Sequence, residues 1–181
     1  MTLNDIIVAA LAQLDRGHDA QTLDVWRDKL TRFANDGVAD LAYAAKPRRT
    51  EPAAVISETL DLTSLGRACL KVLGVKRDGK ELPFRSGGAT GELSLPGVPD
   101  GEVEVTYQFQ PKELSAATDV PELPPACHAL IVTYVVGRER TSGDVSVQRG
   151  GNVYFQMYEA GKRQLLPHAG SPDAHRLVNR W

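Results

Sequence analysis

The chain has 181 residues, of which 42% are hydrophobic, and its formal net charge is −2. A chain of this length and apolar content can bury a sizeable core, which excludes disorder of the whole chain. Acidic and basic residues are nearly balanced in each third of the sequence, so no segment has the basic excess of a surface that follows a nucleic-acid backbone. We therefore expect no nucleic-acid binding by an isolated subunit.

The two cysteines and the apolar pattern predict the compartment. Cys69 and Cys127 are too far apart for a CxxC site and too few for a disulfide framework, so we expect two reduced, buried thiols. The N-terminus lacks the basic and apolar regions of a signal peptide, and no run of 18 apolar residues occurs. The sequence predicts a soluble protein made in the cytoplasm.

Residues 3–14 have the apolar spacing of a short amphipathic helix. Thr2 is the predicted N-cap, and Asp5, three residues later, resembles the acidic partner of a capping box. An acid in the first turn also suits the positive end of the helix dipole. We expect the helix to end at Gly17.

A longer helix is predicted over residues 22–45, closed by the Lys46-Pro47 pair. Gly37 interrupts its apolar stripe, which indicates either a break in the helix or close packing by a neighbouring helix, and close packing is the favoured interpretation. Trp26 lies in the same stripe, where a place in the core is the simplest interpretation and a role in a subunit interface is the alternative. The residues of the stripe are Leu23, Trp26, Leu30, Phe33, Val38 and Leu41.

Residues 54–110 have the character of an antiparallel sheet or sandwich, after a polar boundary at residues 47–52. Residues 54–62 alternate as one strand, and residues 69–84 form a hairpin that turns at Asp78-Gly79. A second hairpin is predicted between residues 91–95 and 102–109. The glycine-rich segment 86–91 has neither the lysine nor the spacing of a phosphate-binding loop, so we expect a connector.

The segment from Tyr107 to Arg140 joins this β-rich region to further helices. Its strand ends at Pro111, and a link containing Pro121, Pro124 and Pro125 leads to an apolar helix that we expect to begin near Leu123. The length and the helical faces of residues 123–140 favour a helix, although the β-branched residues favour a strand.

A final helix is predicted from the turn at residues 141–144 to about Gln164, followed by an extended tail from Pro167. Trp181 ends this tail beside apolar and basic residues, a composition typical of binding hot spots. A docking anchor and a disordered end are both consistent with that position.

No arrangement of residues in the sequence is typical of catalysis or metal binding. The four histidines are not spaced as metal ligands, and the neighbours Cys127 and His128 point in different directions on a helix. Three glutamates could in principle supply a glycosidase pair, but scattered carboxylates are normally solvated surface. They are Glu51, Glu58 and Glu113. We expect no enzymatic activity, metal or cofactor.

The order of elements and one loose motif resemble the head-to-tail connector (adaptor) proteins of tailed bacteriophages. The motif is a strand ending Y-x-x-x-P, a link L-x-x-x-x-D-x-P-x-L-P, and a helix that continues apolar to an arginine. Its positions here are Tyr107, Pro111, Leu114, Asp119, Pro121, Leu123, Pro124, His128, Leu130, Tyr134 and Arg138.

The resemblance implies a structural protein of the virion neck, assembled in the host bacterial cytoplasm. Family members form a ring, usually a dodecamer, that binds the portal protein, extends the DNA channel and offers a docking surface to a downstream tail or nozzle protein during assembly and genome ejection. DNA then passes through without sequence-specific binding, and no membrane is involved. The alternatives are a carbohydrate- or receptor-binding module of the tail and a peptidoglycan hydrolase.

The predicted fold class is α+β: a small antiparallel helical bundle that carries an inserted antiparallel β domain and an extended C-terminal tail. The expected division is residues 1–50 and 113–166 for the helical body, 51–112 for the β-rich insert and 167–181 for the tail. The expected portal-binding residues are Leu165, Leu166, Arg176, Leu177, Val178, Arg180 and Trp181. The expected subunit-interface residues are Trp26, Gly37, Arg138, Tyr154 and Tyr158.

Overall fold

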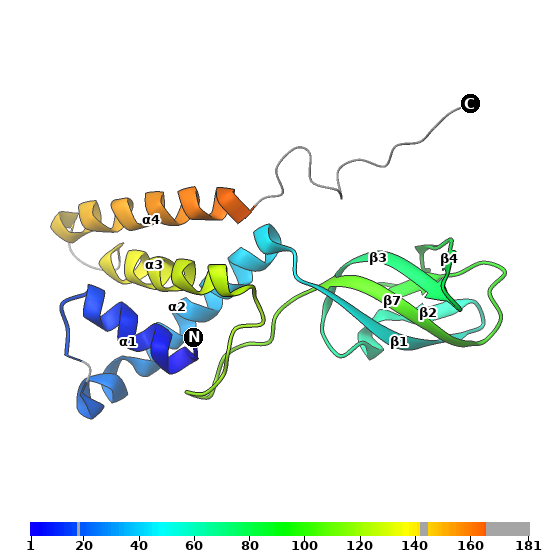
Figure 1. Cartoon of the computed structure of the whole chain (residues 1–181), viewed down its shortest axis with the longest axis horizontal. Coiled ribbons are helices and arrows are strands. Elements are labelled where there is room, and N and C mark those ends of the chain that lie inside the picture. The colour runs from blue at the N-terminus through cyan, green and yellow to red at the C-terminus, as the bar shows by residue number, and fades with distance from the viewer. Residues whose placement is uncertain (18, 142–144, 166–181) are drawn as a thin grey trace. The chain divides into compact units, whose positions relative to one another are not determined.

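A computed structural model describes residues 1–17, 19–141 and 145–165, and the side chains of residues 145–152 are outside this description. The chain is mixed α and β and divides into two compact units. Among the described residues, the helical unit contains 1–45, 114–120 and those from 125 to 165, and the sheet unit contains 46–113 and 121–124. Figure 1 shows the helices and strands of each unit.

The helical unit begins with α1 (Leu3–Gln13) and α2 (Ala20–Ala45). The predicted capping box is confirmed, because the Asp5 backbone N–H donates to the Thr2 hydroxyl and the Thr2 N–H donates to the Asp5 carboxylate. The predicted stop at Gly17 is wrong: α1 ends at Gln13, and the chain turns at Asp15, whose φ is 56°. α2 is unbroken, as close packing at Gly37 requires.

The second half of the unit consists of α3 (Pro125–Thr141) and α4 (Val145–Leu165), and α4 runs back along α3 (Figure 1). The helix prediction for the β-branched segment is confirmed, with a start two residues later than expected. Glycines allow the close approach: a Cβ at Gly137 would lie 3.4 Å from Tyr154 Cβ, and a Cβ at Gly161 would overlap Leu130 Cδ2. α3 is therefore covered by α1, α2 and α4.

The core of the helical unit is aliphatic and continuous from α1 to α3. Its fully buried side chains come mainly from these two helices and from the middle of α2. They include Leu3, Ile6, Ile7, Leu11, Leu30, Leu41, Ile131 and Val135. None of the helices in the described part of the chain combines the length and the apolar content that crossing a bilayer requires.

Residues 114–120 are fixed to the helical unit by hydrogen bonds. The Asn35 side chain accepts from the Leu114 N–H at 2.8 Å and donates to the Leu114 carbonyl at 3.0 Å. The N–H groups of Leu3 and Asn4 donate to carbonyls of the same segment, at Asp119 and at residue 117. These bonds satisfy N-terminal donors of α1 that have no partner within the helix.

The sheet unit holds one antiparallel, curled sheet of seven strands in the order β4-β3-β7-β1-β2-β6-β5. The strands are β1 (Arg48–Ile56), β2 (Thr59–Asp61), β3 (Cys69–Arg77), β4 (Lys80–Leu82), β5 (Arg85–Ser86), β6 (Glu92–Ser94) and β7 (Gly101–Phe109). A short 3-10 helix, η1 (Leu62–Ser64), follows β2. The predicted hairpin at Asp78-Gly79 is confirmed, with φ values of 52° and 76° in the turn.

Two strand predictions are wrong, and in each the chain turns where the residue pattern does not show it. Residues 54–62 are not one strand: β1 and β2 form a hairpin whose turn residues, Ser57 and Glu58, have φ values of 50° and 59°. The second predicted hairpin does not exist, because β7 pairs with β1 and β3, whereas β6 pairs with β2 and β5. Arg48 and Arg49 begin β1 and do not form a boundary loop.

The inner face of the sheet has its own core. The strict alternation of β7 places Val103, Val105, Tyr107 and Phe109 inside, as predicted, and β1 contributes Val55. Tyr107 is fully buried and Phe109 is 8% exposed, so neither ring is available as a surface platform.

Candidate functional site

The aromatic side chains of α2, Trp26, Phe33 and Tyr43, lie outside the core, and the first two share one helix face. Trp26 and Phe33 are seven residues apart, a spacing that places side chains on one helix face. Both are partly exposed and neither belongs to the buried core, so the simplest interpretation of Trp26 as a core residue is wrong.

Three basic side chains cover these rings. The Arg16 guanidinium lies 4.0 Å from the centre of the Trp26 ring, and the Arg138 guanidinium lies 5.4 Å from the centre of Phe33. Lys29 stands between the rings, with its Nζ 5.3 Å from Trp26 and 5.8 Å from Phe33. We call Arg16, Trp26, Lys29, Phe33 and Arg138 the basic-aromatic patch.

Acidic partners hold the basic groups in place. Glu139, whose side chain is 9% exposed, accepts from Lys29 Nζ at 2.6 Å and lies 4.0 Å from Arg16 Nη2. Asp36 lies 3.8 Å from Arg138 Nη2. Three cations therefore face two carboxylates, which leaves too little net positive charge for a surface that binds phosphates.

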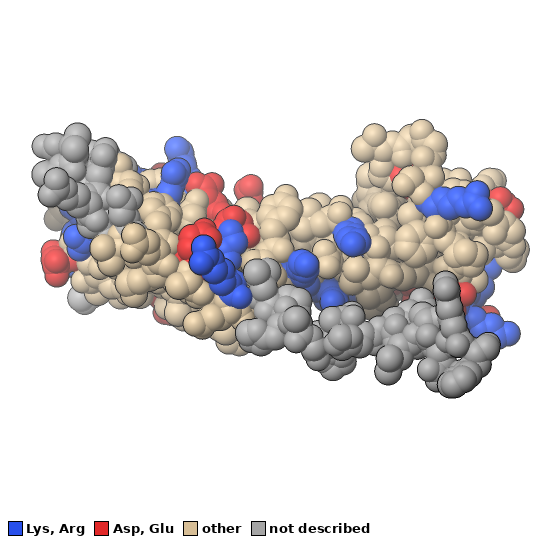
Figure 2. Space-filling model, turned by 90° about the horizontal axis from the view of Figure 1, so that it is seen from above, with Lys and Arg blue, Asp and Glu red and all other residues tan. Residues whose placement is uncertain are grey.

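The patch has the chemistry of a protein-binding surface. Its three basic side chains remain 44 to 46% exposed, so a partner can reach each of them. Tryptophan and arginine are the residue types that most often dominate the binding energy of protein interfaces, and a ring already stacked against a cation is held in one orientation. On the face that Figure 2 shows, basic and acidic side chains are scattered among uncharged residues, without a large area of one sign.

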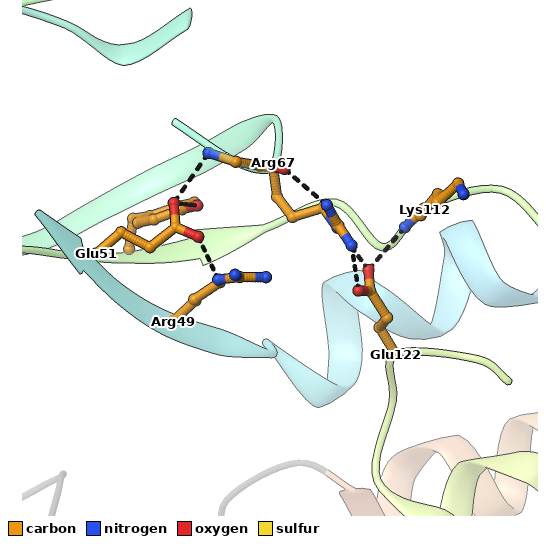
Figure 3. Close-up of polar contacts among 7 residues, drawn as sticks. Arg49, Glu51, Arg67, Lys112 and Glu122 are labelled. Atoms are coloured by element: carbon orange, nitrogen blue, oxygen red, sulfur yellow. Dashed lines mark hydrogen bonds and ion pairs between the residues drawn. The ribbon is translucent and has the colours of Figure 1, made fainter. Parts of the chain in front are cut away.

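A second polar cluster lies in the sheet unit and is drawn in Figure 3. Glu51 accepts from the Gly66 backbone N–H at 2.9 Å and from the Tyr107 hydroxyl at 2.9 Å, and it also pairs with Arg49. The Gly66 hydrogen bond, followed by that of Tyr107, lowers the pKa of Glu51, while burial raises the pKa of Tyr107. An ionised carboxylate with these partners fastens the loop after η1 to the sheet.

Glu122 completes this cluster. Arg67 donates to its two oxygens at 2.8 and 2.6 Å, and the Lys112 N–H donates at 3.0 Å (Figure 3). The hydrogen bonds from Arg67 are the main cause of a lowered pKa of Glu122. The cluster balances its charges internally, so its contacts are those of a structural brace.

The helical unit has a comparable brace between α2 and α4. The Tyr158 hydroxyl donates to Asp40 Oδ2 at 2.5 Å, and Lys162 Nζ donates to the same oxygen at 2.5 Å. Tyr158 is 1% exposed, and burial followed by the bond to Asp40 raises its pKa well above the usual value.

The expected interface residues lie in two different environments. Trp26 and Arg138 come together in the basic-aromatic patch. Gly37 and Tyr158 are buried within the chain, and a Cβ at Gly37 would lie 3.0 Å from the Tyr134 ring. Tyr154 is partly exposed beneath Arg140, 5.4 Å from its guanidinium. Their role between subunits stays a prediction.

Of the expected portal-binding residues, the described part of the chain includes only Leu165, which is the last residue of α4. The others lie outside the described residues: Leu166, Arg176, Leu177, Val178, Arg180 and Trp181.

The groups considered for chemistry have structural partners or lie at the surface. Glu58 accepts from the Gly97 N–H at 2.8 Å, and Glu113 is exposed. His128 is buried, with its Nδ1 3.0 Å from the amino group of Met1. Within residues 1–17, 19–141 and 145–165, no three side chains of histidine, cysteine, aspartate or glutamate converge as metal ligands.

Sequence reasoning missed three members of the patch as site residues: Arg16, Lys29 and Phe33. The seven-residue spacing of Trp26 and Phe33, with Lys29 between them, was a visible signal for an aromatic face. Arg16 carried no such signal, because only the fold brings the loop after α1 against α2.

Comparison with known proteins gives no further constraint. No family model matches the sequence, and no curated protein matches it.

Proposed function

We propose that the chain is a structural head-to-tail connector subunit of a tailed bacteriophage. In this proposal copies form a ring beneath the portal, extend the DNA channel without sequence-specific binding, and provide the docking surface for the tail. The helical unit acts as an antiparallel bundle that makes the subunit contacts. The sheet unit is a domain inserted between the two helical pairs and is presented to the next tail component.

The observation that carries the proposal is the basic-aromatic patch. A tryptophan and a phenylalanine held at the surface by cations lose little conformational freedom when a partner covers them, which favours binding. Its charges are largely compensated by Asp36 and Glu139, so a protein surface suits it better than a nucleic-acid backbone. A head-to-tail contact of this kind closes into a ring when its rotation is suitable.

The described residues favour assembly over the alternative functions. A carbohydrate-binding sheet would need an exposed aromatic platform, and Tyr107 and Phe109 are buried. A hydrolase would need a carboxylic acid with a raised pKa, whereas the pKa of Glu51 is lowered by its hydrogen bonds. The proposal therefore assigns no catalytic role to the chain.

The C-terminal tail is the proposed contact with the portal. It follows α4 directly and ends in an apolar and basic group of residues that includes Arg180 and Trp181. A segment of this composition can supply aromatic and arginine anchors to a partner.

The test combines the full-length protein with the portal ring of the same phage. Size-exclusion chromatography and electron microscopy should show a ring of this protein attached coaxially to the portal. A chain that ends at Leu166 should keep its circular dichroism spectrum and its association with itself but lose the portal. A full-length protein that never joins the portal would overturn the connector function, and normal recruitment of the shortened chain would overturn only the role of the tail.

A further inference from the structure

The outward side of α4 carries an apolar stripe that the described part of the chain leaves uncovered. Val153, Met157 and Ala160 follow the spacing of one helix face, and the two larger side chains are 53% and 56% exposed. A different side of α4, with Tyr154, Tyr158 and Gly161, packs on α2 and α3. The stripe is thus the second apolar face of a helix whose first face is already buried.

A hollow of about 480 Å³ lies along the same helix. It is lined by Phe155, Gln156, Glu159, Ala160 and Arg163, and its lining is more apolar than polar. The carboxylate of Glu159 is 53% exposed beside it. Lys162 Nζ lies 4.0 Å from that carboxylate, and Arg163 adds a second cation, in the lining itself. The hollow therefore suits a large aromatic side chain, and Glu159 offers one exposed acceptor at its edge.

We propose that the C-terminal segment of the same chain, residues 166–181, docks on this side of α4. The segment has apolar residues for the stripe and a basic group for Glu159. They are Leu166, Leu177, Val178 and Trp181, with Arg176 and Arg180.

The segment can reach the stripe from its point of attachment. Its 16 residues begin directly after Leu165 and span up to about 50 Å when extended. Val153 lies twelve residues before the end of α4, which is about 18 Å along the helix axis. The chain therefore has length to turn back and to place Trp181 beside the hollow.

Attachment favours this occupant over a separate molecule. A tethered segment acts at an effective concentration in the millimolar range. To displace it, a free partner must be present at a higher concentration or must bind α4 more tightly. A subunit with its tail on α4 keeps the tail from other proteins until a stronger partner takes it. The inference does not depend on the connector function, because any tail-binding partner would meet the same competition.

The test uses full-length W26F, in which Trp181 is the single tryptophan. Trp181 fluorescence should be blue-shifted relative to the urea-unfolded chain and weakly quenched by acrylamide. M157K in the same background should move both values most of the way to those of the unfolded chain, because it places a charge in the stripe. I56K is the matched control, since Ile56 is 66% exposed in the sheet unit, and it should change neither value.

Two further measurements keep the inference open to refutation. L177S with V178S alters only the tail and should release Trp181 while the circular dichroism spectrum stays unchanged. Dilution by a hundredfold should leave the blue shift of W26F unaltered. Docking within one chain would be overturned by any of three results. The fluorescence of W26F could equal that of the unfolded chain, it could fail to respond to M157K and to the tail variants, or its blue shift could be lost on dilution.

Discussion

Arg67 and Glu122 lie 55 residues apart in the sequence and are joined by two hydrogen bonds of 2.8 and 2.6 Å. Through them the end of the proline-containing link is fastened to the loop before β3, and the Lys112 N–H adds a third bond to the same carboxylate. A bidentate pair of this geometry fixes direction as well as distance. Within the described chain, this ion pair is the main polar contact between residues 121–124 and the rest of the sheet unit.

Glu122→Gln should destabilise the protein at neutral pH and should do so less in acid. Arg67 lowers the pKa of Glu122 below 4.5, so the carboxylate contributes stability that is complete above that value and is lost as the pH falls through the lower pKa of the folded state. Urea unfolding followed by circular dichroism from about pH 6 to about pH 3 measures the difference. A difference between the two proteins that is independent of pH would contradict this linkage.

Tyr158→Phe should lower the free energy of unfolding by about 1 to 2 kcal/mol, because it removes a buried hydroxyl that donates to an ionised carboxylate. Asp40 keeps Lys162 as a partner, which limits the loss. Thermal or urea unfolding measures it. Tyr43→Phe is the matched control on α2, since that ring is 65% exposed and the change should be close to zero. Equal effects at both positions would refute the brace.

The same tyrosine predicts an alkaline response. Burial and Asp40 raise the pKa of Tyr158 in the folded protein above the ordinary value of 10. Its stabilising contribution is therefore complete below pH 10 and declines as the pH rises above it. The stability difference between the wild type and Tyr158→Phe should shrink over that range, and a difference that grows instead would show that the sign is wrong.

Gly37→Leu should destabilise the helical unit by about 2 kcal/mol, although leucine is the better helix former. The Cβ alone would lie 3.0 Å from Tyr134 Cδ1, and that ring is held by Phe155 and Tyr158 at centroid distances of 5.8 and 5.1 Å. Gln21→Leu, at an exposed position of the same helix, is the control for adding a leucine to α2 where no neighbour crowds it. Unfolding of the two variants at the same midpoint would exclude close packing as the reason for the glycine.

Local signals in the sequence predicted the helices well, because these signals are strong. The cap at Thr2, the Lys46-Pro47 pair after α2 and the proline-containing entry to α3 all act within a few residues. The pairing of strands was harder to predict. β7 inserts between β1 and β3 although it follows β6 in sequence, and Ser57-Glu58 forms a tight turn without the glycine that normally marks one.

In the candidate site, too, some residues could be predicted from the sequence and others only from the packing of the elements. Trp26 was chosen from residue type and Arg138 from the connector motif, and both lie in the basic-aromatic patch. Arg16 and Glu139 were not predicted as site residues. Their contacts join different elements and depend on where α1 ends and on how α3 packs against α2. Residue type thus indicated the kind of surface, and only the packing of helices supplied its members.

Trp26→Ala should weaken association between subunits more than truncations on the surface of α2 that lie outside the basic-aromatic patch. A partner-covered tryptophan typically contributes about 2 kcal/mol or more, so the association constant should fall at least tenfold, while the free energy of unfolding of the monomer changes little because Trp26 is outside the core. Sedimentation velocity over a range of concentrations measures association, and Tyr43→Ala, a more exposed aromatic truncation on the same helix, is the matched control. Phe33→Ala should resemble Trp26→Ala, since the two rings share Lys29. If the two patch variants associate as the wild type does, or if Tyr43→Ala weakens association as much as they do, the patch is not the subunit contact and the connector proposal loses the observation that carries it.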